Sequence, residues 1–163
     1  MSDPGTERTE PDGPEARLAT LGVTLPEPPR PAAAYLPVQT AGDLLFTAGQ
    51  VAVGPEGLVA TGMLGAGVDL ETGVRCARQC AINVMAQLKA ELGDLDRVRQ
   101  VVKLTVFVAS DPSFTEQHLV ANGASELFAE VFGERGRHAR SAVGAPSLPT
   151  GTPVEVEAIV QFD

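Results

Sequence analysis

The sequence has few aromatic residues and few cysteines. It contains no Trp, one Tyr and six Phe in 163 residues, although 44% of the residues are hydrophobic. A core of this composition must be filled mostly by Val, Leu and Ala. The two cysteines, Cys76 and Cys80, lie four residues apart in an apparent helix, a spacing that suits neither a disulfide framework nor a zinc site. We therefore predict two buried or half-buried, reduced thiols and a protein that uses neither metal nor cofactor.

The chain also lacks a basic patch and a long hydrophobic segment. Its formal net charge is −9, and an acidic surface repels the phosphates of nucleic acids. No apolar run approaches the roughly 20 residues that a membrane-spanning helix needs. The first residues, MSDPGTERTEPDGPEAR, are charged and rich in Pro and Gly, unlike a secretory signal. These features predict a cytoplasmic protein that binds neither nucleic acid nor membranes.

The length fits one domain preceded by a tail. Residues 1–16 carry many charges and few apolar side chains, which predicts a disordered or extended tail. Residues 17–163 form the predicted domain. Its first part, 21–35, is dense in proline and is expected to run extended over the surface, because proline has no backbone N–H to donate.

Hydrophobic periodicity predicts two long helices among several strands. The first helix spans 69–92, with Asp69 as its N-cap and Gly93 just after its end. The second helix spans 115–132. Strands are predicted at 43–50, 99–109, 138–143 and 153–162, with a hairpin in VAVGPEGLVATG. This order favours an α+β fold with both helices on one face of a mixed sheet.

The last two predicted strands carry the residues best suited to catalysis or ligand binding. In VEVEAIVQF, the two-residue period places Glu155 and Glu157 on one face and the valines on the other. If the segment GAPSLPTG closes a hairpin about its midpoint, Arg140 lies opposite Glu155, and His138 lies opposite Glu157. The pair is then either an ordinary ion pair on a solvated sheet face, or an anion site. In an anion site Arg140 receives a carboxylate, and Glu155 handles a proton or a water.

Several motifs, in the same order along the chain, resemble those of the RidA/YjgF family. They are ARS at 139–141, Leu-Pro at 148–149, VEVEAI at 154–159, FTAGQ at 46–50 (resembling an SGQ strand), VKLTVFV at 102–108, and Asn122 with the helix that follows it. The resemblance covers residues 35–162. Within the family the chain looks like a branch with a longer loop before the first helix and an N-terminal extension.

The resemblance implies a chorismate-mutase-like fold assembled as a homotrimer, with clefts between its subunits. Characterised family members hydrolyse imines and enamines released by pyridoxal-phosphate enzymes, and the products are 2-oxo acids and ammonia. By the same resemblance, Arg140 binds the substrate carboxylate, Glu155 positions or activates water, and Tyr35 lines the cleft. Two further substrate-binding positions depart from the family pattern. Ala48 replaces a serine before Gly-Gln, and Ala142 replaces a cysteine two residues after the arginine.

These departures leave two functions open. The missing hydroxyl at Ala48 removes a hydrogen-bond partner for substrate or water, whereas the cysteine at the Ala142 position mainly offers backbone atoms. The expected function is therefore hydrolytic deamination of small carboxylate-bearing imines or enamines. The alternative is a non-catalytic module that binds small metabolites in the same cleft. The ribonuclease activity attached to the family's names is disfavoured, because affinity for RNA depends on neutralising its phosphates.

Overall fold

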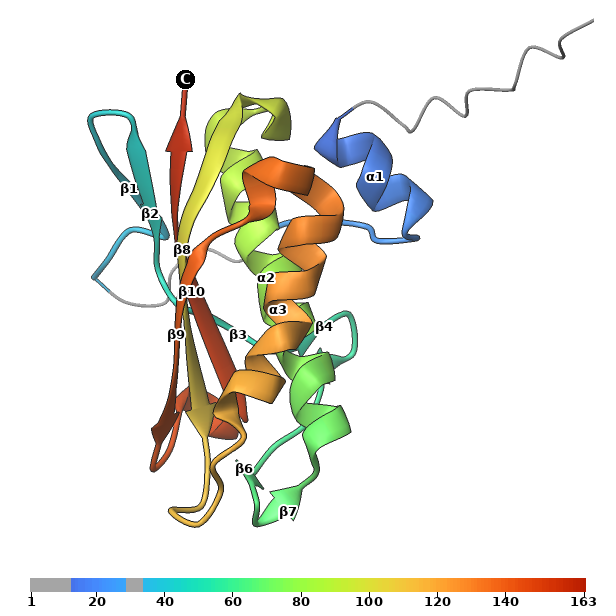
Figure 1. Ribbon diagram of the computed structural model, residues 1–163, viewed down its shortest axis with the longest axis vertical. Coiled ribbons are helices and arrows are strands. Elements are labelled where there is room, and N and C mark those ends of the chain that lie inside the picture. Colours follow the sequence, from blue (N-terminus) through green and yellow to red (C-terminus); the bar gives the residue numbers. More distant parts are fainter. Residues whose placement is uncertain (1–12, 29–33) are drawn as a thin grey trace, which may run out of the picture.

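The computed structural model describes residues 13–28 and 34–163, which form a sheet covered by helices on one face (Figure 1). The sheet order is β1-β2-β10-β8-β9, and β3 also pairs with β10. Its strands are β1 (Val38–Ala41), β2 (Leu44–Thr47), β3 (Gln50–Val51), β8 (Val98–Ala109), β9 (Ala139–Ala145) and β10 (Val154–Phe162). Strands β8 and β9 are parallel, and the other neighbours are antiparallel.

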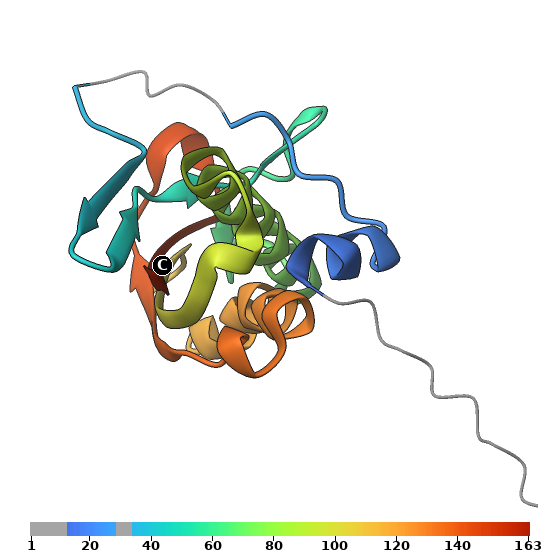
Figure 2. The same cartoon turned by 90° about the horizontal axis from the view of Figure 1, so that it is seen from above.

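Two long helices, α2 (Leu70–Leu92) and α3 (Gln117–Phe132), lie side by side on one face of this mixed sheet (Figures 1 and 2). The predicted α+β architecture is therefore confirmed. The two helices approach closely at Gly123, where a Cβ would overlap the backbone carbonyl oxygen of Val74 in α2. Within the described residues, neither of them nor any other helix has the length and apolar character needed to cross a membrane.

Local signals set the ends of α2 as predicted. The Oδ1 atom of Asp69 accepts a hydrogen bond from the backbone N–H of Thr72 at 2.8 Å, which satisfies a donor at the start of the helix. Gly93, with φ of 78°, ends it in a conformation that costs glycine little. Before α2, the predicted hairpin is present as β4 (Val53–Gly54) and β5 (Gly57–Leu58), and a second small pair follows, β6 (Met63–Leu64) and β7 (Gly67–Val68).

One feature of β8 differs from the alternation in its sequence. We expected Val102 to share the core face with Leu104 and the next alternate residues. The register between β8 and β10 instead shifts at this point, so that Val160 pairs with Val101 and Val102 is skipped. Val101 is buried, and Val102 is 38% exposed. A one-residue bulge reverses the alternation on its far side, which a strict two-residue period does not reveal.

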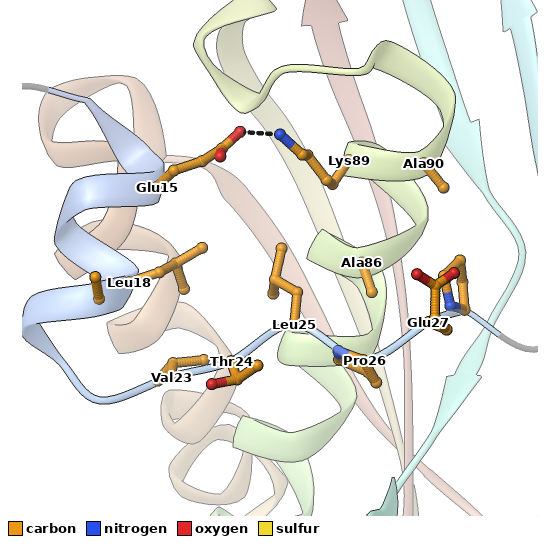
Figure 3. Close-up of a pocket in the computed structure, with 12 residues that line it drawn as sticks. Glu15, Leu18, Val23, Thr24, Leu25, Pro26, Glu27, Ala86, Lys89 and Ala90 are labelled. Atoms are coloured by element: carbon orange, nitrogen blue, oxygen red, sulfur yellow. Dashed lines mark hydrogen bonds and ion pairs between the residues drawn. The ribbon is translucent and has the colours of Figure 1, made fainter.

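The N-terminal part of the described chain packs on the helix layer. Helix α1 (Pro14–Thr20) lies beside α3 (Figure 2), and its Leu18 is buried in the core. Residues 14–16, which we expected in the tail, therefore belong to a helix, while residues 1–12 lie outside the described part. The extended residues 23–28 then cross α2. A groove of about 430 Å³ lies between α1, this segment and the last turns of α2, and an ion pair between Glu15 and Lys89 borders it (Figure 3).

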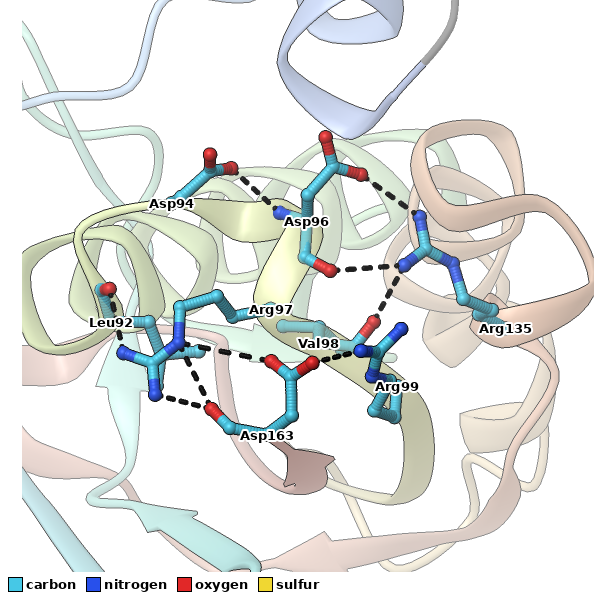
Figure 4. A network of polar contacts seen from close by, with 8 residues as sticks. All are labelled: Leu92, Asp94, Asp96, Arg97, Val98, Arg99, Arg135 and Asp163. Atoms are coloured by element: carbon cyan, nitrogen blue, oxygen red, sulfur yellow. Dashed lines mark hydrogen bonds and ion pairs between the residues drawn. The ribbon is translucent and has the colours of Figure 1, made fainter.

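A polar network fixes the end of the sheet where β9 begins. Three short helical turns connect the main elements: η1 (Leu95–Arg97), η2 (Gly133–Gly136) and η3 (Pro149–Gly151). From η2, Arg135 donates to the carbonyl oxygens of Asp96 and Val98 at 3.2 and 2.9 Å (Figure 4). Arg97 and Arg99 both contact Asp163 after β10. These contacts tie the turn that precedes β9 to the start of β8.

Candidate functional site

The structure separates Arg140 from Glu155. The two last strands do not form the predicted hairpin, because β8 lies between them and β9 runs parallel to it. Arg140 is level with Leu104, whereas Glu155 is level with Phe107. Leu104 is buried under the helices, and residues an odd number apart on a strand face opposite ways. Arg140 and Glu155 therefore lie on opposite faces of the sheet, and the predicted cross-strand pair was wrong.

The predicted pair of His138 and Glu157 was wrong for the same reason. Glu157 is level with Thr105 of β8, and His138 precedes the first residue of β9. The cause is the connection between the strands, which crosses β8 and does not turn back as a tight hairpin. This connection includes Thr150 at a φ of 60°. It is anchored by the buried Thr152, whose hydroxyl accepts from the N–H of Ala52 at 3.2 Å and donates to the carbonyl oxygen of Val154 at 3.0 Å.

The guanidinium of Arg140 is held by α3. Its Nη1 donates to Oδ1 of Asn122 at 2.9 Å and to Oγ of Ser125 at 3.1 Å. Its Nη2 donates to the carbonyl oxygen of His118 at 3.1 Å. These three acceptors follow a spacing of four and three residues, which places them on one side of a helix. The sequence motif that contains Asn122 did not reveal this role, and Ser125 was missed, although the three-residue spacing of the two residues fits one side of a helix.

One edge of the Arg140 guanidinium remains available. Its three bonds use both hydrogens of Nη1 and one of Nη2. The Nε–H and the second Nη2–H have no partner among the residues that the structure describes. The nitrogens Nε and Nη2 share one edge of the planar group, and N–H groups on such an edge match the two oxygens of a carboxylate. The side chain is thus preorganised to receive an anion of that shape.

Glu155 occupies the sheet face that the helices leave uncovered. It lies in β10 between Val51 of β3 and Phe107 of β8, and it is half-buried. A Cβ at position 49 would overlap its carboxylate, so the backbone at Gly49 lies directly against this side chain. Burial raises the pKa of Glu155, and the nearby charge of Glu157 raises it further. A carboxylate with a raised pKa is a better proton acceptor at neutral pH than an ordinary surface glutamate.

The positions of the other predicted residues follow from the neighbouring strands. Ala48 connects β2 to β3 and is next to Gly49, and its N–H donates to the carbonyl oxygen of Pro37 at 2.8 Å. Tyr35 is 54% exposed and lies two residues before Pro37. The remaining predicted residue, Ala142, is level with the buried Val106 and packs against the core on the same face as Arg140.

The predicted site residues thus form two groups. Ala48 and Glu155 lie at the break between β2 and β3, with Tyr35 two residues before the Pro37 that bonds to Ala48, whereas Arg140 and Ala142 lie on β9 against α3. Because β9 is the last strand in the sheet order, the second group is at the edge of the sheet. Within the described residues, no cluster of three His, Cys, Asp or Glu side chains could hold a metal ion.

The environments of the two cysteines indicate a role in packing. Cys76 and Cys80 are free and buried in α2, as predicted. Burial raises the pKa of the Cys76 thiol to about 11, and the Cys80 thiol contacts the carbonyl oxygen of Val154 at 3.4 Å. Thiols that stay protonated at neutral pH are poor nucleophiles, so neither belongs to the candidate site.

Comparison with known proteins decides the family. Residues 15–159 match the model of a family described as "YjgF/chorismate mutase-like, putative endoribonuclease". The chain belongs to the RidA/YjgF family. It is 50% identical over 149 residues to Protein TCP17 of Trypanosoma cruzi, which covers 91% of this chain and 93% of that protein. The predicted family is therefore confirmed.

Solved structures of similar proteins agree with the RidA/YjgF fold. The crystal structure of Atu1372 from Agrobacterium tumefaciens, a protein with unknown function, matches with a TM-score of 0.87 and 50% identity over 92% of both chains. The structure of TdcF from E. coli with bound serine matches with a TM-score of 0.61 and 25% identity, covering 84% of this chain and 94% of that one.

Proposed function

We propose that this RidA/YjgF protein hydrolyses small carboxylate-bearing imines or enamines to 2-oxo acids and ammonia. The observation that carries the proposal is the guanidinium of Arg140, which three bonds to α3 hold in place with one edge available for a carboxylate. We place this activity in the cytoplasm, because the two free cysteines fit a reducing compartment.

The proposed site is shared between copies of the chain. Arg140 and Glu155 are separated by one intervening strand and by three residues along it, which puts their Cα atoms about 14 Å apart at the usual strand and residue spacings. They also point to opposite faces, so one small ligand cannot touch both in one copy. A second copy that packs its open sheet face near β9 supplies the missing Glu155.

A homotrimer gives three equivalent sites of this kind. The open sheet face exposes apolar side chains, including Phe46 and Val143, which are 38% and 45% exposed. Apolar surface of this kind favours association. In this arrangement the contact that joins Arg140 of one copy to Glu155 of the next is head-to-tail, and a contact of this type closes into a ring of three when the rotation between copies is one third of a turn.

The chemistry needs few groups. Arg140 holds the substrate carboxylate through its planar fork. Glu155 of the neighbouring copy takes a proton from a water as that water attacks the carbon of the protonated imine, and it returns this proton to the nitrogen. The C–N bond then breaks and ammonia leaves as the carbonyl forms, and the proton of the hydroxyl passes back to Glu155. We assign Tyr35 and Ala48, together with Glu155, to the lining of the cleft, and the backbone of Ala142 to the border of the carboxylate. The serine bound to TdcF supports a pocket for a small amino-acid-like molecule in this family.

A second function is favoured by Ala48. This position carries no hydroxyl next to Glu155, so the cleft offers one fewer partner for a reacting water. The site would then bind small carboxylates without hydrolysing them. Ribonuclease activity is disfavoured by the net charge of −9, because an acidic surface repels RNA.

A coupled assay tests the proposal. Purified protein is offered 2-aminoacrylate, made in place by a dehydratase, and the appearance of pyruvate is followed. We expect faster hydrolysis than in the absence of the protein, and light scattering should give about three times the 16.9 kDa mass of one chain. Pyruvate binding without faster hydrolysis would instead favour the second function, in which the site only binds small carboxylates. A monomer would contradict a site shared between copies.

The substitution Ala48→Ser is expected to raise the rate of hydrolysis. The added hydroxyl would stand one residue before Gly49, whose backbone lies against the Glu155 carboxylate, and we expect it to bind the reacting water or the substrate nitrogen. One hydrogen bond to a reacting group corresponds to roughly a tenfold change in rate. The single-turnover rate with 2-iminopropanoate measures it. Ala142→Ser is the control, because it adds the same hydroxyl in the other group of site residues. An equal gain in both variants would argue against a specific role for position 48.

A further inference from the structure

A chain of hydrogen bonds lies behind Arg140. His138 is the last residue before β9, and its Nε2 is 2.9 Å from Oγ of Ser125 in α3. Its Nδ1 is 2.6 Å from the carbonyl oxygen of Gly136 in η2. The same Ser125 hydroxyl accepts from Nη1 of Arg140 at 3.1 Å. The backbone of η2, the imidazole, the hydroxyl and the guanidinium are thus connected in series.

The chemistry of the groups fixes the direction of these bonds. A carbonyl oxygen only accepts, so Nδ1 of His138 carries a hydrogen and donates to Gly136. In the neutral ring Nε2 then has a free lone pair, which accepts the hydroxyl hydrogen of Ser125. This arrangement leaves the oxygen lone pairs of Ser125 for the Nη1–H of Arg140. Neutral His138 therefore orients Ser125 as an acceptor for the guanidinium.

The surroundings of the ring favour this neutral form. Burial lowers the pKa of His138, the bond to the Gly136 carbonyl opposes this effect, and the charge of Arg140 lowers the pKa further. From α3 the ring also meets Phe128, edge to face at 6.3 Å between ring centroids, which carries no charge. Within the described part of the chain, Arg140 is the charged group that acts on the ring.

We infer that Ser125 and His138 are positioning residues for Arg140, and that His138 couples the binding of a carboxylate at Arg140 to pH. The inference rests on the proposed function at one point, the binding of a carboxylate by Arg140. When His138 is protonated, Nε2–H donates to Ser125, whose oxygen can accept from the imidazolium and the guanidinium together. The guanidinium stays in place and gains a second positive charge behind it.

The sign of the coupling follows from charge. A carboxylate bound at Arg140 offsets the positive charge that disfavours the imidazolium, so it raises the pKa of His138 in the complex. By reciprocity, protonated His138 binds the carboxylate more tightly than neutral His138 does. Affinity should therefore be constant at high pH, where the ring is neutral with and without ligand. It should rise as the pH falls through the pKa of His138 in the complex, and level off below the pKa in the free protein.

Pyruvate, the product of 2-iminopropanoate hydrolysis, is a suitable probe because its carboxylate does not titrate between pH 5 and 8. Calorimetry on the full chain is expected to show binding about three- to tenfold tighter at pH 5 than at pH 8. NMR of the imidazole nitrogens should show Nδ1 protonated and Nε2 unprotonated in the neutral ring of His138. Saturating pyruvate should raise the pKa of that ring.

Variants separate this coupling from other titrating groups. His138→Gln offers Ser125 an acceptor that does not titrate, so most of the pH dependence should disappear. His118→Asn should keep the dependence, because only the backbone carbonyl of His118 bonds to Arg140. Ser125→Ala should weaken binding about three- to tenfold at pH 8, and Ser125→Thr, which keeps a hydroxyl, should restore it.

Two results would overturn the inference in distinguishable ways. Pyruvate could bind with an affinity that does not change as His138 titrates, and without shifting the pKa of His138. The hydrogen-bond chain behind Arg140 would then not be coupled to the site, and the proposed function would stand. A pH dependence that persists unchanged in His138→Gln has the same meaning. If pyruvate does not bind at any pH, Arg140 is not a carboxylate receptor, and the proposed function fails together with the inference.

Discussion

Replacing Glu155 with glutamine is expected to lower the rate of 2-iminopropanoate hydrolysis by roughly a hundredfold or more, the usual scale of a lost general base. The amide keeps the shape of the side chain against Gly49 and removes its ability to accept a proton. The assay is the single-turnover rate at saturating substrate. Pyruvate binding should change little by comparison, because the carboxylate receptor is Arg140.

Glu157→Gln is the matched control for this variant. Glu157 lies on the same sheet face, two residues along β10, and it contributes to the raised pKa of Glu155. The base must be ionised to act, so the rate should fall as the pH drops through the raised pKa of Glu155. Removing the charge of Glu157 should move this acidic limb to lower pH without a large loss at neutral pH. Equal losses in both variants would show that the two carboxylates act through overall charge and that Glu155 is not the base.

The parts of the fold that sequence reasoning predicted are those with local signals. The ends of α2 follow from Asp69 and Gly93, whose hydrogen bond and backbone conformation involve only their own helix. The faces of β10 follow from a two-residue period that is unbroken as far as Val160. The bulge at Val102 could not be predicted, because it depends on how β8 pairs with a strand some fifty residues later in the chain.

In the candidate site, too, the sequence reveals the local features and does not reveal those that depend on long-range contacts. Arg140 and Glu155 could be singled out from residue type and pattern, but their relation depends on the path of the connection between β9 and β10. A tight hairpin and a crossover past β8 can contain the same turn residues. In the structure, the buried Thr152 holds the crossover against the segment after β3. The helical spacing of the Arg140 acceptors on α3 likewise indicates that they share one side of the helix. The strand that packs against this side is set by tertiary structure, which the spacing does not reveal.

The corrected geometry changes how the proposed site must be built. In a hairpin, one copy of the chain would hold both Arg140 and Glu155. With the two residues on opposite faces of the sheet, each site needs Arg140 from one copy and Glu155 from another. Arg140→Ala alone should abolish pyruvate binding and hydrolysis, since no other group on β9 offers a planar fork. Glu155→Gln should bind pyruvate and fail in hydrolysis.

Mixing these two inactive variants is expected to restore activity. When Arg140→Ala and Glu155→Gln chains are unfolded together in equal amounts and refolded, a site is intact if its first copy carries Arg140 and its second carries Glu155. Random assembly of a ring satisfies both conditions in about one quarter of the sites, so the mixture should recover about one quarter of the wild-type rate per site.

The control for this mixing experiment is Arg140→Ala combined with chains that carry both substitutions. No site in that mixture contains both native residues, so it should stay inactive even though its subunits exchange in the same way. Native mass spectrometry checks that mixed assemblies form. If mixed assemblies of the two single variants form and remain inactive, Arg140 and Glu155 do not act together across copies, because random assembly places them on adjacent subunits whichever way the ring is closed. Recovery near one quarter would require a shared site, since neither variant contains a complete one of its own.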